Sequence, residues 1–130
     1  MFATAILVMV GVAMAAYHNN KQIEYDLSVI GNGTATVVQV HDPSCQLCRR
    51  LNRNLNRVKD DFKADIQFKI ANLASDEGRQ FAQRHRVEHV TLMFFNKRGQ
   101  RVNTLQGVTP AEDIRAALDT FSKLRKKILL

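Results

Sequence analysis

Two cysteines separated by two residues are the part of this sequence best suited to chemistry. Cys45 and Cys48 are the only cysteines among the 130 residues, and they follow the β-branched run Thr36–Val40 and the dipeptide Asp42-Pro43. Thiols at this spacing form a reversible disulfide in redox proteins, or supply half of a zinc site. Which of these uses applies depends on the element that positions the pair.

That element is predicted to be the start of a helix. Proline suits the first helical position and Ser44 or the preceding aspartate can cap the free amides, so we expect the helix to begin at Asp42-Pro43. A helix N-terminus carries partial positive charge, which stabilises a thiolate and lowers its pKa. Arg49 lies on the same helix face as Cys45, and its cation acts in the same direction. Cys45 is therefore the predicted nucleophile, and Cys48 the resolving thiol.

Two other uses of the cysteines stay open, a static structural pair and a metal site. With His85 and His89 the cysteines make four candidate zinc ligands. The separation between the two pairs is far longer than in a zinc finger, so we expect no metal and no cofactor beyond the disulfide. His41, at the end of the strand before the turn, is a candidate base or hydrogen-bond donor beside the cysteines, or simply an exposed strand end.

The N-terminal segment predicts where this chemistry takes place. Residues 1–17 contain no charged side chain. They are slightly short for a spanning helix, about 17–25 residues, and long for a signal-peptide core, about 7–15. Ala13-Met14-Ala15 matches a cleavage pattern, whereas the basic residues that usually precede the apolar run are missing. We predict a signal peptide or membrane anchor over 1–17, a linker over 18–33, and cysteines in the periplasm or another extracytoplasmic compartment.

Composition restricts the classes of partner. The formal net charge is +7, which suits an anionic membrane surface, an acidic partner or nucleic acid. No ribonucleoprotein pattern and no paired zinc-finger spacing accompany the charge, so we expect a solvated basic surface and no nucleic-acid partner. A chain of 130 residues, 45% of them hydrophobic, has room for one ordinary globular domain.

The apolar periodicity beyond the cysteines predicts alternating helices and strands. The cysteine helix should run to about Phe62, and a weak strand-like stretch, Ile23–Ile30, precedes the domain. The other expected elements are strands at Ile66–Ile70, Thr91–Phe95 and Arg101–Gln106, and helices at Ser75–His85 and after the capping box Thr109–Glu112, with Pro110 at the first helical position.

The order of these elements indicates an α/β fold with a central mixed sheet flanked by helices, behind an N-terminal hydrophobic helix. Strands joined by helical crossovers should lie parallel, and the hairpin of the last two strands should add an antiparallel edge. The domain is expected over 34–126, followed by a short tail over 127–130.

Over Thr36–Lys126 the chain resembles the thioredoxin family. The resemblance rests on the cysteine pair after a valine-rich strand, on the segment 87–100 (VEHVTLMFFNKRGQ), and on Gln106-Gly107. It implies a thioredoxin-like fold, thiol–disulfide exchange with protein thiols or disulfides, and a substrate groove that includes Val90, Thr91 and Gly107.

The departures from the family pattern are equally informative. Gln46-Leu47 replaces the usual Gly-Pro between the cysteines, and Ser44 replaces a tryptophan. The family's buried acid falls at Gln39 and its lysine partner at Asn72, so both are neutral amides, a change that orphans neither partner. The cis-proline position falls at Thr91, and because a cis bond before another residue costs about 2.5–4 kcal/mol, we expect trans bonds there.

The prediction is therefore a thiol–disulfide oxidoreductase outside the cytosol. Cys45 and Cys48 carry the exchange, and His41, Arg49 and the residues at the changed family positions support it. The alternative is a non-catalytic thioredoxin-like binding module whose cysteines form a structural disulfide or hold a metal. Because Gln39 cannot titrate, we also expect a poor general reductase that serves a narrow set of partners.

Overall fold

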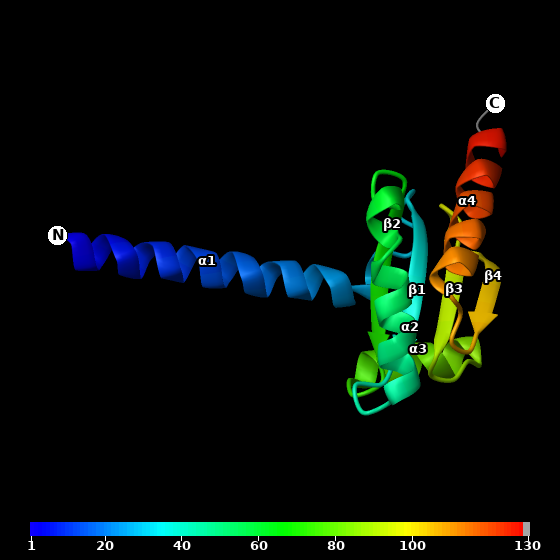
Figure 1. The fold of residues 1–130 in the computed structure, drawn as a ribbon, viewed down its shortest axis with the longest axis horizontal. Helices are drawn as coiled ribbons and strands as arrows, with labels where there is room; N and C mark the ends of the chain where they lie inside the picture. The colour runs from blue at the N-terminus through cyan, green and yellow to red at the C-terminus, as the bar shows by residue number, and fades with distance from the viewer. Residues whose placement is uncertain (129–130) are drawn as a thin grey trace.

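The computed structural model describes residues 1–128 and contains one mixed sheet with helices on both faces. The four strands lie in the order β2-β1-β3-β4 (Figure 1). In chain order the elements are α1 (Phe2–Tyr25), η1 (Leu27–Val29), β1 (Ala35–His41), α2 (Gln46–Asn56), η2 (Lys59–Phe62), β2 (Ile66–Asn72), α3 (Asp76–His85), β3 (Thr91–Phe95), β4 (Arg101–Gln106) and α4 (Ala111–Ile128). The predicted α/β fold with a central mixed sheet is confirmed.

The direction of one strand differs from the prediction. β1 and β2 pair in parallel, as expected for strands joined by a helical crossover. β3 also follows a helix, yet it pairs antiparallel with β1, so the expectation of parallel pairing was wrong for this strand. Figure 1 shows α3 at the end of the sheet where β2 finishes. Because α3 does not return the chain to the opposite end, β3 starts where β2 stops and runs the other way.

Alternation along the strands divides the core between the two faces of the sheet. On one face Val37 and Leu92 pack with residues of α2 and α4, including Cys48. On the other face Val38 and Met93 pack with residues of α3 and η1. Since both faces are covered, β1 is buried almost throughout, and its odd-numbered residues face the helix that carries the cysteines.

The N-terminal helix is longer than predicted. α1 continues to Tyr25, so the weak strand expected at Ile23–Ile30 is replaced by the end of this helix and by η1. The helix is long and apolar enough to cross a membrane, and its apolar window is not buried. Its C-terminal end contacts β2, because the Nζ atom of the buried Lys69 donates to the carbonyl of Ile23. The predicted linker is therefore partly helical.

Two helix boundaries also differ. α2 ends at Asn56 rather than near Phe62, because the chain tightens there and Val58 N donates to Leu55 O. α4 begins at Ala111, immediately after Pro110, so the proline precedes the helix instead of opening it. The helix extends to Ile128 and thus into the predicted tail, of which residues 129–130 lie outside the described range.

Candidate active site

Cys45 is the N-cap of α2, so the thiol itself performs the capping role that the sequence assigns to its neighbours. Its Sγ atom accepts a hydrogen bond from the backbone N–H of Cys48 at 3.3 Å. The helix begins at Gln46, because Asp42 caps a separate turn by accepting the N–H and hydroxyl of Ser44 at 2.9 and 2.7 Å. The sulfur therefore lies directly at the positive end of the helix.

The two thiols differ in exposure and in acidity. Cys45 is partly exposed, and hydrogen bonds from the thiol and the backbone of Cys48 lower its pKa. Cys48 is fully buried, and desolvation raises its pKa. The nearby Asp42 carboxylate opposes the effect on Cys45. This ordering matches the expected pair of an accessible nucleophile and a protected resolving thiol, whose roles remain a proposal.

Arg49 contacts the turn in front of the helix. Its guanidinium donates to the carbonyl of Pro43 at 2.9 Å, which ties the start of α2 to the loop after β1. Its charge also lowers the pKa of His41, after the larger effect of burial. A direct contribution of Arg49 to the acidity of Cys45 stays a prediction.

Gln39 connects β1 to the cysteine helix. Its side chain is 1% exposed, and its Nε2 atom donates to the carbonyl of Cys48 at 3.4 Å. The same nitrogen lies 3.3 Å from Nδ1 of His41. Gln39 thus joins Cys48 to the histidine at the strand end. His41 belongs to the site through this amide rather than through a contact with Cys45.

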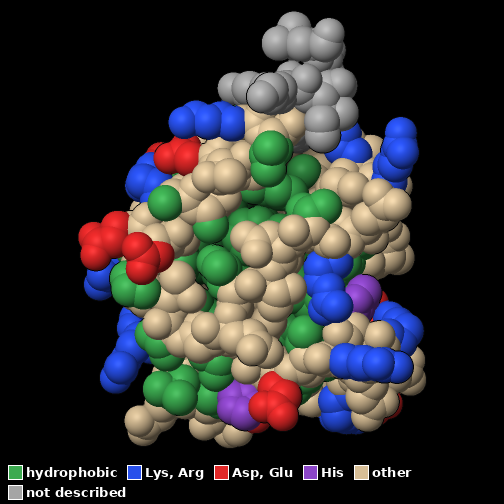
Figure 2. Space-filling view, turned by 90° about the vertical axis from the view of Figure 1, so that its right-hand side faces the viewer, with side chains coloured by type: hydrophobic (Ala, Val, Ile, Leu, Met, Phe, Trp, Pro, Cys, Tyr) green, Lys and Arg blue, Asp and Glu red, His purple; other side chains and the backbone are tan. Residues whose placement is uncertain are grey.

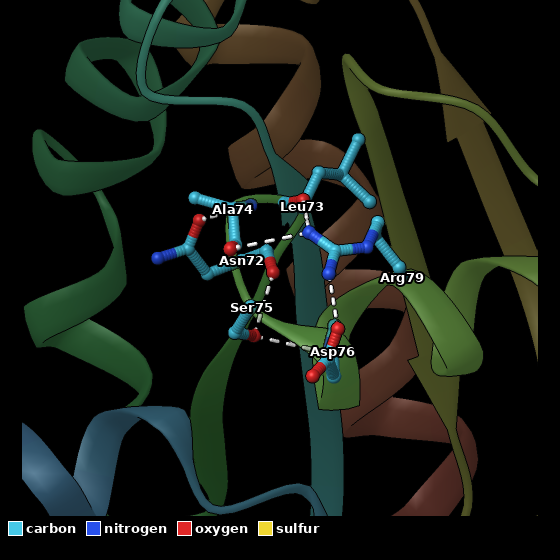
Figure 3. A network of polar contacts seen from close by, with 7 residues as sticks. Asn72, Leu73, Ala74, Ser75, Asp76 and Arg79 are labelled. Carbon is cyan, nitrogen blue, oxygen red and sulfur yellow. Dashed lines mark hydrogen bonds and ion pairs between the residues drawn. The ribbon is translucent and has the colours of Figure 1, made fainter.

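Asn72 occupies the position of the family's lysine, but its side chain does not interact with Gln39 in the hydrogen bonds of the described residues. It lies opposite His41 in the β1–β2 ladder, but its side-chain oxygen accepts the N–H of Ala74 at 2.9 Å. Its carbonyl accepts the hydroxyl of Ser75, which in turn caps α3 (Figure 3). Asn72 therefore builds the turn between β2 and α3, and its side chain is engaged there.

The loop before β3 contains the other predicted groove residues. The backbone carbonyl of Val90 accepts the N–H of Gly107 at 2.8 Å, which joins two of them. Thr91 is buried and its hydroxyl donates to the carbonyl of Glu88 at 2.9 Å. The hydroxyl proton is therefore used within the chain. As predicted, the described residues contain no cis peptide bond.

The loop also contains a feature that sequence reasoning missed. Val90 has a φ of 59°, a left-handed conformation that is rare for a β-branched side chain. Its backbone interacts with the Cys48 thiol and favours the thiolate there, partly offsetting the burial that raises the pKa of Cys48. Strain of this kind persists only where the surrounding structure fixes the backbone, and it clusters at functional sites. No local sequence signal marks a valine in this conformation.

The histidines considered as zinc ligands lie in different surroundings. His85 packs against Phe81 and Phe95, with ring centroids 4.4 and 5.3 Å away. These two phenylalanines belong to the core on the face of the sheet that α3 covers. His89 is exposed and acts electrostatically on Asp42. Within residues 1–128, no group of three or more His, Cys, Asp or Glu side chains is arranged to hold a metal ion.

Comparisons with known proteins agree on one family. The family model described as Thioredoxin matches residues 16–120. Thioredoxin from Pyropia yezoensis is 22% identical over 93 residues, which cover 72% of this chain and 85% of that protein. The chloroplastic Thioredoxin M4 of Arabidopsis thaliana is 22% identical over 103 residues, covering 79% of this chain and 52% of that protein.

Solved structures show the same fold. A thioredoxin from Thermus thermophilus superposes with a TM-score of 0.63 at 23% identity, covering 74% of this chain and 83% of the other. The protein Trxlp of Edwardsiella tarda EIB202 gives a TM-score of 0.61 at 22% identity, covering 70% and 87%. The residues that the family model matches, 16–120, contain the cysteine pair, β1 and the loop before β3.

Proposed function

Since this chain belongs to the thioredoxin family, we propose that it exchanges disulfides with partner proteins outside the cytosol through Cys45 and Cys48. The observation that carries the proposal is the position of Cys45, partly exposed at the N-terminus of α2 with a lowered pKa. A thiolate attacks disulfides far faster than a thiol, and a buried second thiol is protected from the solvent.

The exchange proceeds through a mixed disulfide. The Cys45 thiolate attacks one sulfur of the partner's disulfide, and the other partner sulfur leaves as a thiolate. Cys48 then loses its proton and attacks Cys45, which releases the second partner sulfur. The cysteine pair ends oxidised and the partner ends reduced by two electrons. The same steps in reverse oxidise a partner dithiol, and the reduction potential of the pair determines the direction.

Trapping of the mixed disulfide tests this function. Cys48→Ser should accumulate a covalent adduct with a disulfide-containing protein, because the resolving step is removed, and dithiothreitol should release the adduct. Cys45→Ser is the matched control and should form none, since the remaining thiol is buried. Trapping by neither variant would favour a binding module with static cysteines, and equal trapping by both would overturn the assignment of nucleophile and resolving thiol.

The location outside the cytosol is supported by α1. Its apolar window is not buried against the domain, which suits a signal sequence or a membrane anchor. A reporter that is active only outside the cytosol, fused after residues 1–20, should be active. Activity of a cytosolic reporter at the same position would reject export. The mass of the mature protein decides between cleavage near Ala15 and an uncleaved anchor.

The surface supports protein partners. Figure 2 shows the face on the α4 and β4 side, where Lys and Arg side chains lie around the margins of apolar and neutral surface. Val102 and Leu124 are exposed hydrophobic residues of these two elements. A surface that binds nucleic acid usually gathers its basic residues into one stripe. The distribution on this face therefore fits a solvated basic surface, with protein thiols or disulfides as partners and the membrane contacted through α1.

A further inference from the structure

The side chain of Gln39 has one satisfied end and one unsatisfied end. Its Nε2 atom faces two acceptors, the carbonyl of Cys48 and Nδ1 of His41. Its Oε1 atom is buried, and among the described residues it is the buried side-chain oxygen without a hydrogen-bond partner. A buried acceptor without a donor is costly, so this oxygen needs an explanation.

The arrangement fixes the protonation of the neighbouring ring. Because Nε2 of Gln39 is a donor, Nδ1 of His41 must be an acceptor, and the neutral ring then carries its proton on Nε2. Adding a proton to Nδ1 would bring two donors together. A half-turn of the amide removes this conflict at the ring, because Oε1 of Gln39 then accepts the new N–H, and the long bond from Nε2 to the Cys48 carbonyl is given up. Protonation of His41 and the orientation of Gln39 are thus linked.

The Cys48 thiol lies at the same end of β1 as this pair. The backbone of Asp42, the residue after His41, hydrogen-bonds the Cys48 thiol, so the end of β1 reaches the sulfur. Cys48 is fully buried and must lose a proton before it can attack. Gln39 cannot take this proton, because an amide does not titrate. His41 is the residue of β1 with a side chain that can take it at neutral pH.

We propose that His41 accepts the proton that Cys48 releases when it resolves the mixed disulfide, and that Gln39 is the positioning residue whose amide turns to hold the protonated ring. This inference rests on the proposed function. In the step, a bond forms between the two cysteine sulfurs and the bond from Cys45 to the partner sulfur breaks. The electron pair leaves on the partner thiolate, and His41 later returns the proton to that thiolate or to solvent.

Burial and the neighbouring charges together lower the pKa of His41. Burial lowers the pKa of His41, the Asp42 carboxylate opposes this effect, and the Arg49 guanidinium adds to it. His89 acts on Asp42 from the loop before β3, and Asn72, opposite on β2, is neutral. The ring is therefore neutral near neutral pH, the state that can accept a proton.

Stopped-flow reaction with dithiobis-nitrobenzoate tests the proposal, because each released thiolate absorbs light. The first phase reports attack by Cys45, and the second reports resolution by Cys48. With His41 as proton acceptor, the rate constant of the second phase should change by less than about threefold between pH 7 and 8. His41→Asn should show a rise of about tenfold over this interval, because its rate then follows the fraction of free Cys48 thiolate.

Variants separate the roles of the two residues. Gln39→Met should lower the second-phase rate at pH 7 by about tenfold, the effect of one hydrogen bond to a charged group. Asn72→Ala is the matched control from the same end of the sheet, and it should keep the flat profile of the wild type. NMR titration of His41 in the wild type, with Cys45 blocked by alkylation, should give a pKa at the lower end of the flat region.

Each outcome bears on a distinct claim. A tenfold rise per pH unit in the wild type, a flat profile in His41→Asn, or an NMR pKa that does not match the lower end of the flat region would overturn the proton transfer. An unchanged second phase in Gln39→Met would overturn the positioning role. Absence of the first phase would contradict the proposed exchange function itself.

Discussion

Two neutral amides at the same end of the sheet show how differently similar residues are used. Gln39 on β1 is buried next to the cysteine helix, and one of its amide atoms has no partner among the described residues. Asn72 on β2 lies in a turn that uses its carbonyl and its side-chain oxygen. The incompletely bonded amide lies at the site, and the fully engaged one supports the fold. The unmet bond therefore lies in the region that we propose to be reactive.

The turn at Asn72 has further support that the Gln39 region lacks. The guanidinium of Arg79 donates to the carbonyls of Leu73 and Ala74 and also pairs with Asp76 (Figure 3). Gly78 allows α3 to approach the backbone of Asn72 closely. These contacts make the turn a rigid structural unit, and the predictions below separate its effects from those of the site.

The largest effect on stability is expected from Gly78→Ala. An added Cβ would lie 1.9 Å from the carbonyl oxygen of Asn72, which is backbone and cannot move aside. Alanine normally favours a helix over glycine by about 1 kcal/mol, but this clash should outweigh it and reduce the free energy of unfolding by about 3 kcal/mol or more. Urea unfolding measures the loss. Gly11→Ala, with nothing within 4 Å, is the control and should leave the domain's stability unchanged.

The cysteines should differ next most strongly, in their rates of alkylation. Because its pKa is lowered, Cys45 has a larger thiolate fraction at pH 6 than an ordinary cysteine, whereas the raised pKa and burial of Cys48 suppress its thiolate. Iodoacetamide at pH 6 should therefore modify Cys45 at least about 100-fold faster. Mass spectrometry of quenched samples gives the ratio. Equal or reversed labelling would refute the assignment of nucleophile and resolving thiol.

Gln39→Asp should affect both activity and stability. Asn72 occupies the position of the family's lysine, so a carboxylate at this buried position has no lysine partner. Its burial should cost about 2 kcal/mol in the free energy of unfolding. If water reaches the new group, it can take the proton of Cys48, and reduction of insulin should become faster than in the wild type, for which we expect a slow rate. A wild type as fast as an ordinary thioredoxin would contradict the role assigned to Gln39.

Much of this architecture follows from local sequence signals. The valines of β1, the cysteine spacing and the hairpin after β3 are sufficient to predict the mixed sheet and the paired thiols. The start of α2 is not predictable in the same way, because the turn in which Cys45 N donates to Asp42 O displaces the helix from Pro43 to Gln46. The direction of β3 is likewise not predictable locally, because it depends on the end of the sheet at which α3 lies (Figure 1).

Features that arise from tertiary contacts were outside the reach of sequence patterns. The left-handed backbone of Val90 is held by its contact with Gly107, which is distant in sequence. The unmet oxygen of Gln39 depends on the approach of α2 to β1, and no neighbouring residue signals it. Asn72 is readable as a turn former from its own chemistry, although the family resemblance places it at the position of a buried lysine.

The smallest expected effect concerns Asn72 itself. Asn72→Ala removes the acceptor for the N–H of Ala74, a bond at an exposed turn, and should reduce the free energy of unfolding by about 1 kcal/mol. Asn72→Asp keeps an oxygen acceptor for the N–H of Ala74, so it should retain wild-type stability within about 0.5 kcal/mol. Neither variant should alter the alkylation ratio of the two cysteines, because the side-chain oxygen of Asn72 is bonded within the turn, to the N–H of Ala74. A change in that ratio above about threefold in Asn72→Ala would show that the two amides act together after all, and that the turn belongs to the site.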